Sequence, residues 1–466
     1  MNTYTIVSPE RLNVTVPLPA SKSISNRALI IYALTGCQQL PDNLSDCDDT
    51  DVIIKALRDM PEVIDIKAAG TAMRFMTALL AATPQTADFR AKTLDDRLQT
   101  EDDRPKASHL LTGTERMKHR PIKLLVDALR HLGADISYAG EEGFPPLRIS
   151  GRQLEGGLLE VAGSISSQYI SALLLIGPML KNGLTLRLKG DVISRPYIDL
   201  TLWTMKEFGA VAEWTGVDTI EVKPQGYTPR PYLVENDWSA ASYWYEMVAL
   251  SKDPEAEVRL EGLMDGSRQG DSSVRYIFSL LGVKTKFENT TTGIPTTVTL
   301  RKSGHCVSRL EYDFSNAPDL AQTIVCTCCA LGVPFHFTGL QTLKIKETDR
   351  IEALKTEMLK LGFVLTDIDG RELVWNGDRS EFRVQSSQFT VHSSQLAARS
   401  STVNRELSTV NYQESIDTYE DHRMALAFAP LSLVMPISIN HPQVVTKSYP
   451  HFWNHLREAG FTIVQS

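Results

Sequence analysis

The sequence has no long apolar run, few cysteines and no excess of positive charge. Its 466 residues contain no stretch of about 18 consecutive apolar residues, so we expect no membrane-spanning helix. The N-terminus lacks a basic region followed by an apolar stretch, so we expect no signal peptide and a cytoplasmic location. Lysine and arginine number 48 against 56 aspartates and glutamates, a net charge of −8, which argues against general nucleic-acid binding.

Two clusters of potential metal ligands have simpler interpretations. Cys326 and Cys329 form a Cys-x-x-Cys pair, but the pair lies inside the apolar run 320–333 and no second pair follows. Small cysteines buried in a helix are therefore favoured over a redox or metal site. The four aspartates in 46–51 precede an apolar periodic segment, which favours acids in a first helical turn. We predict no metal.

The sequence does contain a repeated arrangement of basic and hydroxyl side chains just ahead of apolar helical patterns. A helix N-terminus exposes unpaired N–H groups and carries about half a positive charge, so added Lys or Arg makes an anion site. One such start is typical of a solvated helix end, whereas six in one chain predict a ligand with several phosphates or carboxylates. The six starts are at 22–27, 70–74, 120–121, 166–168, 346–350 and 419–424.

A structural repeat is visible in five glycines that each follow a helical pattern and precede a β-prone segment. They are Gly133, Gly209, Gly282, Gly362 and Gly460, at intervals of 76, 73, 80 and 98 residues. Glycine suits the left-handed position after a helix. We therefore predict an α/β fold whose unit of strands plus two helices recurs about every 75 residues.

Two segments interrupt this repeat, and a third marks a domain crossing. Residues 83–109 are charged and without clean periodicity, and we predict an exposed insertion. Residues 385–412 divide into four similar heptads rich in Ser and Thr, which favours a low-complexity surface insertion over a coiled coil. The proline-bracketed segment 229–238 is typical of a crossing between domains.

Ten motifs, in order along the chain, closely resemble the 3-phosphoshikimate 1-carboxyvinyltransferase, or EPSP synthase, family. They lie at 19–27, 69–74, 117–122, 163–172, 194–199, 237–243, 316–319, 346–350, 421–424 and 447–450. The resemblance implies two similar domains, each of three βαβαββ units with helices inside and sheets outside. The implied domains are 19–234, and 1–18 plus 235–466, with the active site between them.

The resemblance also implies a reaction, which is transfer of the enolpyruvyl group of phosphoenolpyruvate to the 5-hydroxyl of shikimate 3-phosphate. Both small molecules carry a phosphate and a carboxylate, which fits six anion-binding helix starts. Addition and elimination through a tetrahedral intermediate need a base, an acid and cations, but no cofactor and no metal. The family expectation is a monomer.

Residue roles follow from the matching motifs. Asp319 would accept the hydroxyl proton, Glu347 would protonate the methylene carbon, and Lys22 would assist proton transfer. Asp319 could also cap a helix, His422 could merely orient Arg423, and Lys346 would lower the pKa of Glu347. The implied shikimate 3-phosphate ligands are Lys22, Ser23, Arg27, Ser166, Ser167, Gln168, Ser194, Tyr197, Asp319 and Lys346. The implied phosphoenolpyruvate ligands are Lys22, Gly70, Arg120, Gln168, Arg350, His422, Arg423 and Lys447.

The chain departs from the family pattern in three places. Ala68 stands where many members have Asn, and Thr342 where some have Asn. The stretch from Arg27 to Gly70 is shorter than usual, so a strand pair of that unit could be trimmed.

The residues disfavour three alternative functions. The sister family, which transfers enolpyruvate to UDP-N-acetylglucosamine, carries a Lys-Asn pair where this chain has Lys22-Ser23, and usually a loop cysteine that 83–109 lacks. A catalytically silent relative is disfavoured by the intact Lys22, Asp319 and Glu347. A nucleotide kinase is disfavoured because no G-x-x-x-x-G-K-[ST] occurs.

Overall fold

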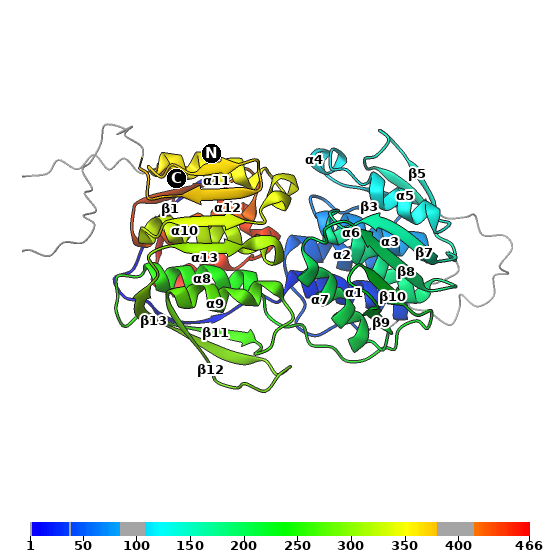
Figure 1. Cartoon of the computed structure of the whole chain (residues 1–466), viewed down its shortest axis with the longest axis horizontal. Coiled ribbons are helices and arrows are strands. Elements are labelled where there is room, and N and C mark those ends of the chain that lie inside the picture. The colour runs from blue at the N-terminus through cyan, green and yellow to red at the C-terminus, as the bar shows by residue number, and fades with distance from the viewer. Residues whose placement is uncertain (1, 37–38, 84–107, 380–413) are drawn as a thin grey trace, which may run out of the picture.

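The computed structural model describes residues 2–36, 39–83, 108–379 and 414–466. Buried apolar side chains form two clusters, one from residues 20–234 and one from residues 6–18 and 238–461. Figure 1 shows two corresponding halves side by side, with both chain ends in the second half. The predicted insertion 385–412 lies outside the described residues, as does most of 83–109. The predicted insertion 83–109 extends too far toward the C-terminus, because His109 is already the first residue of strand β4 (His109–Thr112).

The described residues form five four-stranded sheets that share one strand order. In the sheet β7-β8-β10-β9, the first pair is parallel and the other two pairs are antiparallel. Parallel neighbours need a crossover, here provided by α6 (Ser167–Ile176), whereas the last two strands form a hairpin. The first half contains β7 (Gly157–Ala162), β8 (Leu184–Lys189), β9 (Ala212–Trp214), β10 (Thr219–Val222), β3 (Val63–Asp65), β4, β5 (Asp135–Tyr138) and β6 (Leu147–Ser150).

The second half holds the other three sheets and takes two strands from the N-terminus. Strand β1 (Thr3–Val7) lies between β19 and β20, and β2 (Asn13–Pro17) pairs in parallel with β11. These sheets comprise β11 (Glu257–Leu263), β12 (Leu281–Phe287), β13 (Thr296–Cys306), β14 (Leu310–Asp313), β15 (Phe335–Thr338), β16 (Thr366–Ile368), β17 (Glu372–Trp375), β18 (Glu414–Ile416), β19 (Ile437–Asn440) and β20 (Thr462–Gln465).

The sixth unit is reduced. It has helices α1 (Lys22–Thr35) and α2 (Asp48–Asp59), but its described strand pairing is limited to the bridges Ala20–Asn236 and Asp42–Leu233. The short stretch between Arg27 and Gly70 predicted this trimming.

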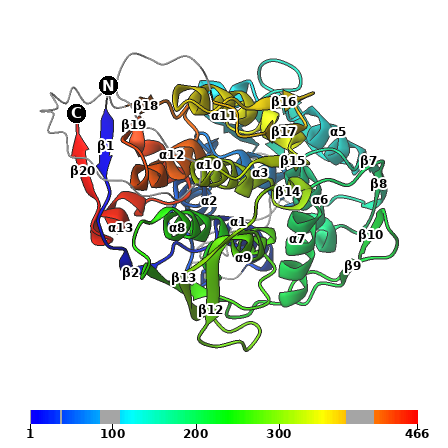
Figure 2. The same ribbon diagram turned by 60° about the vertical axis from the view of Figure 1, so that its left-hand side comes forward.

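Each half is built around three helices that are buried on nearly all sides. They are α1, α3 (Gly70–Ala82) and α6 in the first half, and α8 (Trp238–Leu250), α10 (Ala321–Leu331) and α12 (His422–Phe428) in the second. Most of their residues are buried, including polar ones such as Asn26 and Glu246, which is typical of core helices. Figure 2 shows α10 among α8, α11 and α12. The remaining helices are α4 (Glu115–Lys118), α5 (Lys123–His131), α7 (Arg195–Glu207), α9 (Val274–Leu280), α11 (Arg350–Lys360) and α13 (Phe452–Glu458).

The predictions about local structure are largely confirmed. All five repeat glycines have φ between 80° and 100°, and a strand follows or includes each one. The cysteines of the Cys-x-x-Cys segment are buried in α10. Acidic residues of the 46–51 cluster occupy the first turn of α2. Within the described ranges, no helix is long and apolar enough to cross a membrane.

Candidate active site

The predicted anion-binding helix starts converge at the junction of the two halves. Helices α1, α3 and α6 begin there from the first half, and α11 and α12 from the second. All predicted site residues except Ser194 and Lys447 line one pocket there. Asp49 and Thr71 also line this pocket. Asp49 belongs to the acidic cluster 46–51, for which the sequence predicts only a place in a first helical turn. Thr71 lies inside the motif 69–74.

Aspartate caps set the starts of the two helices from the second half. Asp349 accepts hydrogen bonds from the backbone N–H groups of Ile351 (3.1 Å) and Glu352 (3.2 Å) at the start of α11. Asp421 accepts one from the N–H of Arg423 (2.9 Å) at the start of α12. Asp421 also accepts from Nε of Arg350 at 2.7 Å. One capping carboxylate therefore fixes both arginines at the pocket wall.

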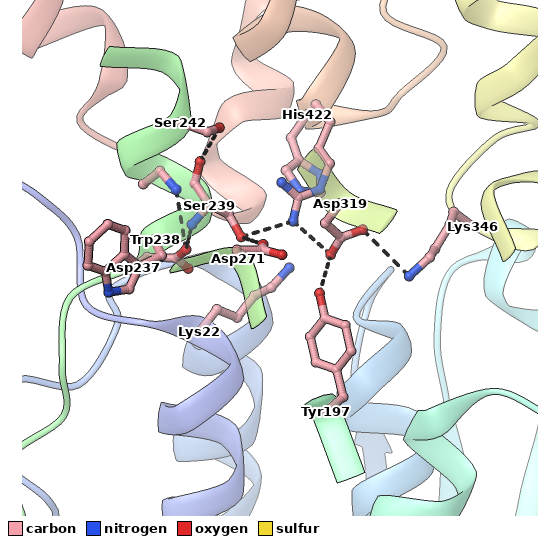
Figure 3. Close-up of polar contacts among 12 residues, drawn as sticks. Lys22, Tyr197, Asp237, Trp238, Ser239, Ser242, Asp271, Asp319, Lys346 and His422 are labelled. Atoms are coloured by element: carbon pink, nitrogen blue, oxygen red, sulfur yellow. Dashed lines mark hydrogen bonds and ion pairs between the residues drawn. The ribbon is translucent and has the colours of Figure 1, made fainter. Parts of the chain in front are cut away.

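Asp319 is the most heavily coordinated carboxylate of the site (Figure 3). Its oxygens accept from Arg350 Nη1 (3.0 Å), Arg423 Nη2 (2.8 Å) and Tyr197 Oη (3.1 Å), and Lys346 Nζ lies 3.6 Å away. Burial raises the pKa of Asp319, but Arg423, Lys346 and Arg350 outweigh burial and hold it well below its usual range. The alternative role of Asp319 as a helix cap is wrong, because α10, which begins at Ala321, has Leu320 as its N-cap and no side-chain cap.

Glu347 is held by a different pair of cations. Its carboxylate lies 2.8 Å from Arg350 Nη2 and 3.1 Å from Lys447 Nζ. Burial raises the pKa of Glu347, but Lys447 and Arg350 keep it well below its usual range. The predicted direction is confirmed, whereas the predicted cause is wrong. Lys346 faces Asp319 instead, so Lys346 does not pair with Glu347, although the two are adjacent in sequence.

Lys22 is paired with an acid that sequence reasoning had not placed in the site. Its ammonium lies 3.2 Å from the carboxylate of Asp49, which is only 3% exposed. Burial lowers the pKa of Lys22, but Asp49 more than compensates, so the pKa is raised and the ammonium stays charged.

Two arginines of the site have no carboxylate partner in the part of the chain that the structure describes. Arg27 is 3% exposed and donates only to neutral groups, among them Thr201 Oγ1 (2.7 Å) and the carbonyl of Ser23 (2.8 Å). Burial lowers its pKa to about 10. Arg120 packs directly on Gly70, where an added Cβ would lie 2.6 Å from its Nη1. Positive charge without an acidic partner, buried at Arg27 and half-buried at Arg120, favours binding of an anion.

Several predicted residues occupy supporting positions. Ser166 caps α6 by accepting from the N–H of Gln168 (3.4 Å), whose side chain donates to Thr71 (3.1 Å). Ser194 stands outside the pocket lining, at the start of α7, and its N–H donates to the carbonyl of Ser315 in the other half (3.2 Å). At the atypical position 68, the Ala68 carbonyl accepts from Lys447 (3.2 Å).

His422 does not orient Arg423 by a hydrogen bond, so that alternative is wrong. Neither ring nitrogen has a hydrogen-bond partner among the described residues, and the side chain is buried. Burial and the charge of Lys22 hold its pKa well below the usual range, so the ring is neutral and faces the pocket. Arg423 is oriented instead by Asp319, Asp421 and Tyr243, whose hydroxyl accepts at 3.2 Å.

Comparisons with known proteins identify one family. The family model described as EPSP synthase (3-phosphoshikimate 1-carboxyvinyltransferase) matches residues 6–456. A 3-phosphoshikimate 1-carboxyvinyltransferase of Bacteroides fragilis is 53% identical over 461 residues, covering 99% of this chain and 98% of its own length. That of Shewanella pealeana is 31% identical over 483 residues, covering 97% and 98%.

The fold agrees with these relatives. The solved structure of EPSP synthase from Acinetobacter baumannii matches with a TM-score of 0.71 over 100% of both chains, at 19% sequence identity. A full-length family match and a relative more than half identical leave no other assignment. The chain belongs to the EPSP synthase (3-phosphoshikimate 1-carboxyvinyltransferase) family.

Proposed function

We propose that this enzyme transfers the enolpyruvyl group of phosphoenolpyruvate to the 5-hydroxyl of shikimate 3-phosphate and releases phosphate. The product, 5-enolpyruvylshikimate 3-phosphate, belongs to the route to chorismate and the aromatic amino acids. The observation that carries the proposal is 53% identity along 99% of the chain to a relative named for this reaction. The two half-buried carboxylates, Asp319 and Glu347, and their surrounding cations would supply the acid, the base and the anion ligands that the reaction needs.

The ion pairs of the site suggest how substrates activate its carboxylates. Arg350, Arg423 and Lys346 contact Asp319, and Arg350 and Lys447 contact Glu347. These cations are also the proposed ligands of substrate phosphate and carboxylate groups. Arriving anions would compete for them, so the pKa values of Asp319 and Glu347 would rise toward the range useful for proton transfer.

The proposed chemistry has two stages. In the addition, the 5-hydroxyl oxygen bonds to C2 of phosphoenolpyruvate while Asp319 takes its proton and Glu347 gives a proton to the methylene carbon. In the elimination, the resulting methyl group returns a proton to Glu347, the double bond re-forms and the C2–O bond to phosphate breaks, while the leaving phosphate takes the proton that Asp319 had accepted. Lys22, held by Asp49 at 3.2 Å, would neutralise charge on phosphoenolpyruvate.

The remaining roles divide between the two substrates. For shikimate 3-phosphate, we assign Arg27 as the unpaired cation at the phosphate. Lys22, Ser23, Ser166, Ser167, Gln168, Ser194, Tyr197, Asp319 and Lys346 complete that set. For phosphoenolpyruvate, we assign Arg120 as the unpaired cation, with Gly70 leaving room for it. Lys22, Gln168, Arg350, His422, Arg423 and Lys447 complete the second set.

Domain boundaries, oligomeric state and location are part of this proposal. The two buried clusters support one domain at 19–234 and another at 1–18 plus 235–466. We expect a monomer, which light scattering coupled to size exclusion would test, in the cytoplasm.

The proposal is tested by phosphate release from phosphoenolpyruvate in the presence of different acceptors. We expect release with shikimate 3-phosphate and none with UDP-N-acetylglucosamine or without an acceptor. Release only with UDP-N-acetylglucosamine would assign the sister reaction. A folded protein that binds shikimate 3-phosphate but releases no phosphate would be the catalytically silent relative.

A further inference from the structure

Next to the proposed catalytic base lies a second buried carboxylate that the reaction scheme does not use. Asp271 lies in the 3-10 turn Gly270–Ser273 and is 5% exposed. One of its oxygens, Oδ2, accepts a hydrogen bond from the hydroxyl of Ser239 at the start of α8. Its other oxygen accepts none from the described residues. Figure 3 shows Asp271 and Ser239 beside Asp319.

A directed chain of hydrogen bonds joins Asp271 to the base. Arg423 Nη2 donates to Asp319 Oδ2 at 2.8 Å, and the same nitrogen donates to Ser239 Oγ at 3.5 Å. A guanidinium can only donate, and a serine hydroxyl has a single hydrogen to give. The chain therefore runs from Arg423 through Ser239 to Asp271. Because Ser239 donates its hydrogen to Asp271, its oxygen can accept the hydrogen bond from Arg423.

We propose that Asp271 is a positioning residue that acts through Ser239 to share the guanidinium of Arg423 with Asp319. The inference rests on the proposed function, in which Asp319 is the base and Arg423 an anion ligand. An arginine held entirely by Asp319 would keep that carboxylate ionised and weakly basic. An arginine drawn partly toward Ser239 and Asp271 leaves Asp319 a better acceptor of the hydroxyl proton.

The charge of Asp271 makes this sharing depend on pH. Burial and the nearby charge of Asp319 raise the pKa of Asp271 to about 7, with Arg423 and Ser239 acting in the opposite direction. The other groups that face it are Asp237 at the start of α8 and Tyr197 on α7. Arg275 on α9 pairs instead with Asp265 at 2.7 Å.

The sign of the pH effect follows from the two states of Asp271. Above its pKa, Asp271 is ionised, attracts Arg423 and repels negative charge on Asp319, so Asp319 becomes a stronger base. Below it, Asp271 is neutral and Arg423 binds Asp319 more fully. Turnover should therefore fall as the pH drops through about 7, by a factor typical of a weakened general base, roughly tenfold.

Asp271→Asn isolates the charge, because asparagine has nearly the same shape and its oxygen can still accept from Ser239. We expect the kcat of this variant to be roughly tenfold lower than that of wild type near pH 8 and equal to it near pH 6. The fall in kcat around pH 7 should be absent from its pH profile. Both KM values should stay within about threefold, because Asp271 does not line the substrate pocket. Ser239→Ala should lower kcat in the same way.

Asp265→Asn is the matched control, since it removes a carboxylate six positions earlier that pairs with Arg275 outside this cluster. Its kcat and pH profile should equal those of wild type. The inference is overturned if Asp271→Asn keeps the wild-type kcat and limb, or if it lowers kcat equally at every pH together with the unfolding temperature. If wild type itself shows no turnover with both substrates, the proposed function fails. That result is seen without any variant, so it is distinct from the outcomes that overturn the role of Asp271.

Discussion

Lys447 lies 3.1 Å from the carboxylate of Glu347 and, with the same ammonium, donates to the backbone carbonyl of Ala68 at 3.2 Å. Lys447 and Glu347 belong to the second half of the molecule and Ala68 to the first. A single side chain therefore joins the proposed acid to the opposite wall of the pocket. The position of the two halves and the ionisation of Glu347 are coupled through this contact.

Lys447→Met should lower activity, because it keeps the apolar stem but removes the ammonium that contacts both halves. We expect kcat to fall by roughly 10- to 100-fold and the KM for phosphoenolpyruvate to rise, as for loss of one charge-assisted contact in a catalytic site. Steady-state kinetics with both substrates varied would measure this. Lys189→Met, at an exposed strand position paired with Glu160, is the control. Unchanged kcat and KM in Lys447→Met would contradict the assigned role.

Gly70→Ala should weaken binding of phosphoenolpyruvate selectively. The new Cβ would lie 2.6 Å from Arg120 Nη1 and 3.0 Å from Cζ, so the guanidinium must move away. A displacement near 1 Å predicts a rise of roughly tenfold or more in the KM for phosphoenolpyruvate, with that for shikimate 3-phosphate within about threefold.

The control for Gly70→Ala is Gly216→Ala, where an added Cβ would be no closer than 3.7 Å to its neighbours. Kinetics of both variants, with each substrate varied in turn, would check the expectation. Equal effects of Gly70→Ala on both KM values would show that Arg120 does not serve phosphoenolpyruvate alone.

Glu246 makes the stability of the protein depend on pH away from the active site. It is fully buried in α8, and neither oxygen accepts a hydrogen bond from the described residues. The Thr327 hydroxyl, which acts to lower the pKa of Glu246, donates its hydrogen to the Thr323 carbonyl at 2.7 Å. Burial raises the pKa of Glu246 well above its usual 4.5. At pH values between the unfolded and the folded pKa, the folded protein therefore holds a proton here that the unfolded chain has released.

Stability from this group is complete below pH 4.5, the unfolded value, and is lost as the pH rises toward the folded pKa. Glu246→Met removes that dependence. Between the unfolded and the folded pKa, we expect its advantage in unfolding free energy over wild type to grow by about 1.4 kcal/mol per pH unit. Urea unfolding near pH 5 and pH 8 would measure this, with Glu255→Met at an exposed site as control. An advantage independent of pH would contradict the assigned protonation.

Features that depend on local sequence were predictable. The starts of α11 and α12 follow from a capping aspartate ahead of an apolar period, and the structure places Arg350 and Arg423 there as anticipated. The repeat was visible because a glycine after a helix has few alternatives at positive φ. The short stretch between Arg27 and Gly70 likewise predicted the reduced sixth unit.

Partners across the chain were not predictable from one sequence. The contacts of Lys22 with Asp49 and of Lys447 with Ala68 depend on how separate units pack. Lys346 and Glu347 are adjacent in sequence but face different partners, because the backbone leaves the helical conformation at Lys346, where ψ is −145°. Asp271 lies in none of the motifs that the reaction requires, so its place beside the site is visible only from its contact with Ser239.

The central claim is that Glu347 supplies the proton in a reaction that needs both substrates. The most direct measurement is phosphate release from phosphoenolpyruvate, with and without shikimate 3-phosphate, by wild type, Glu347→Gln and the surface control Glu372→Gln, whose side chain contacts His336. We expect release by wild type and the control only with both substrates, and a loss of roughly 100-fold or more in Glu347→Gln. Wild-type release by Glu347→Gln, or release without shikimate 3-phosphate, would contradict the account.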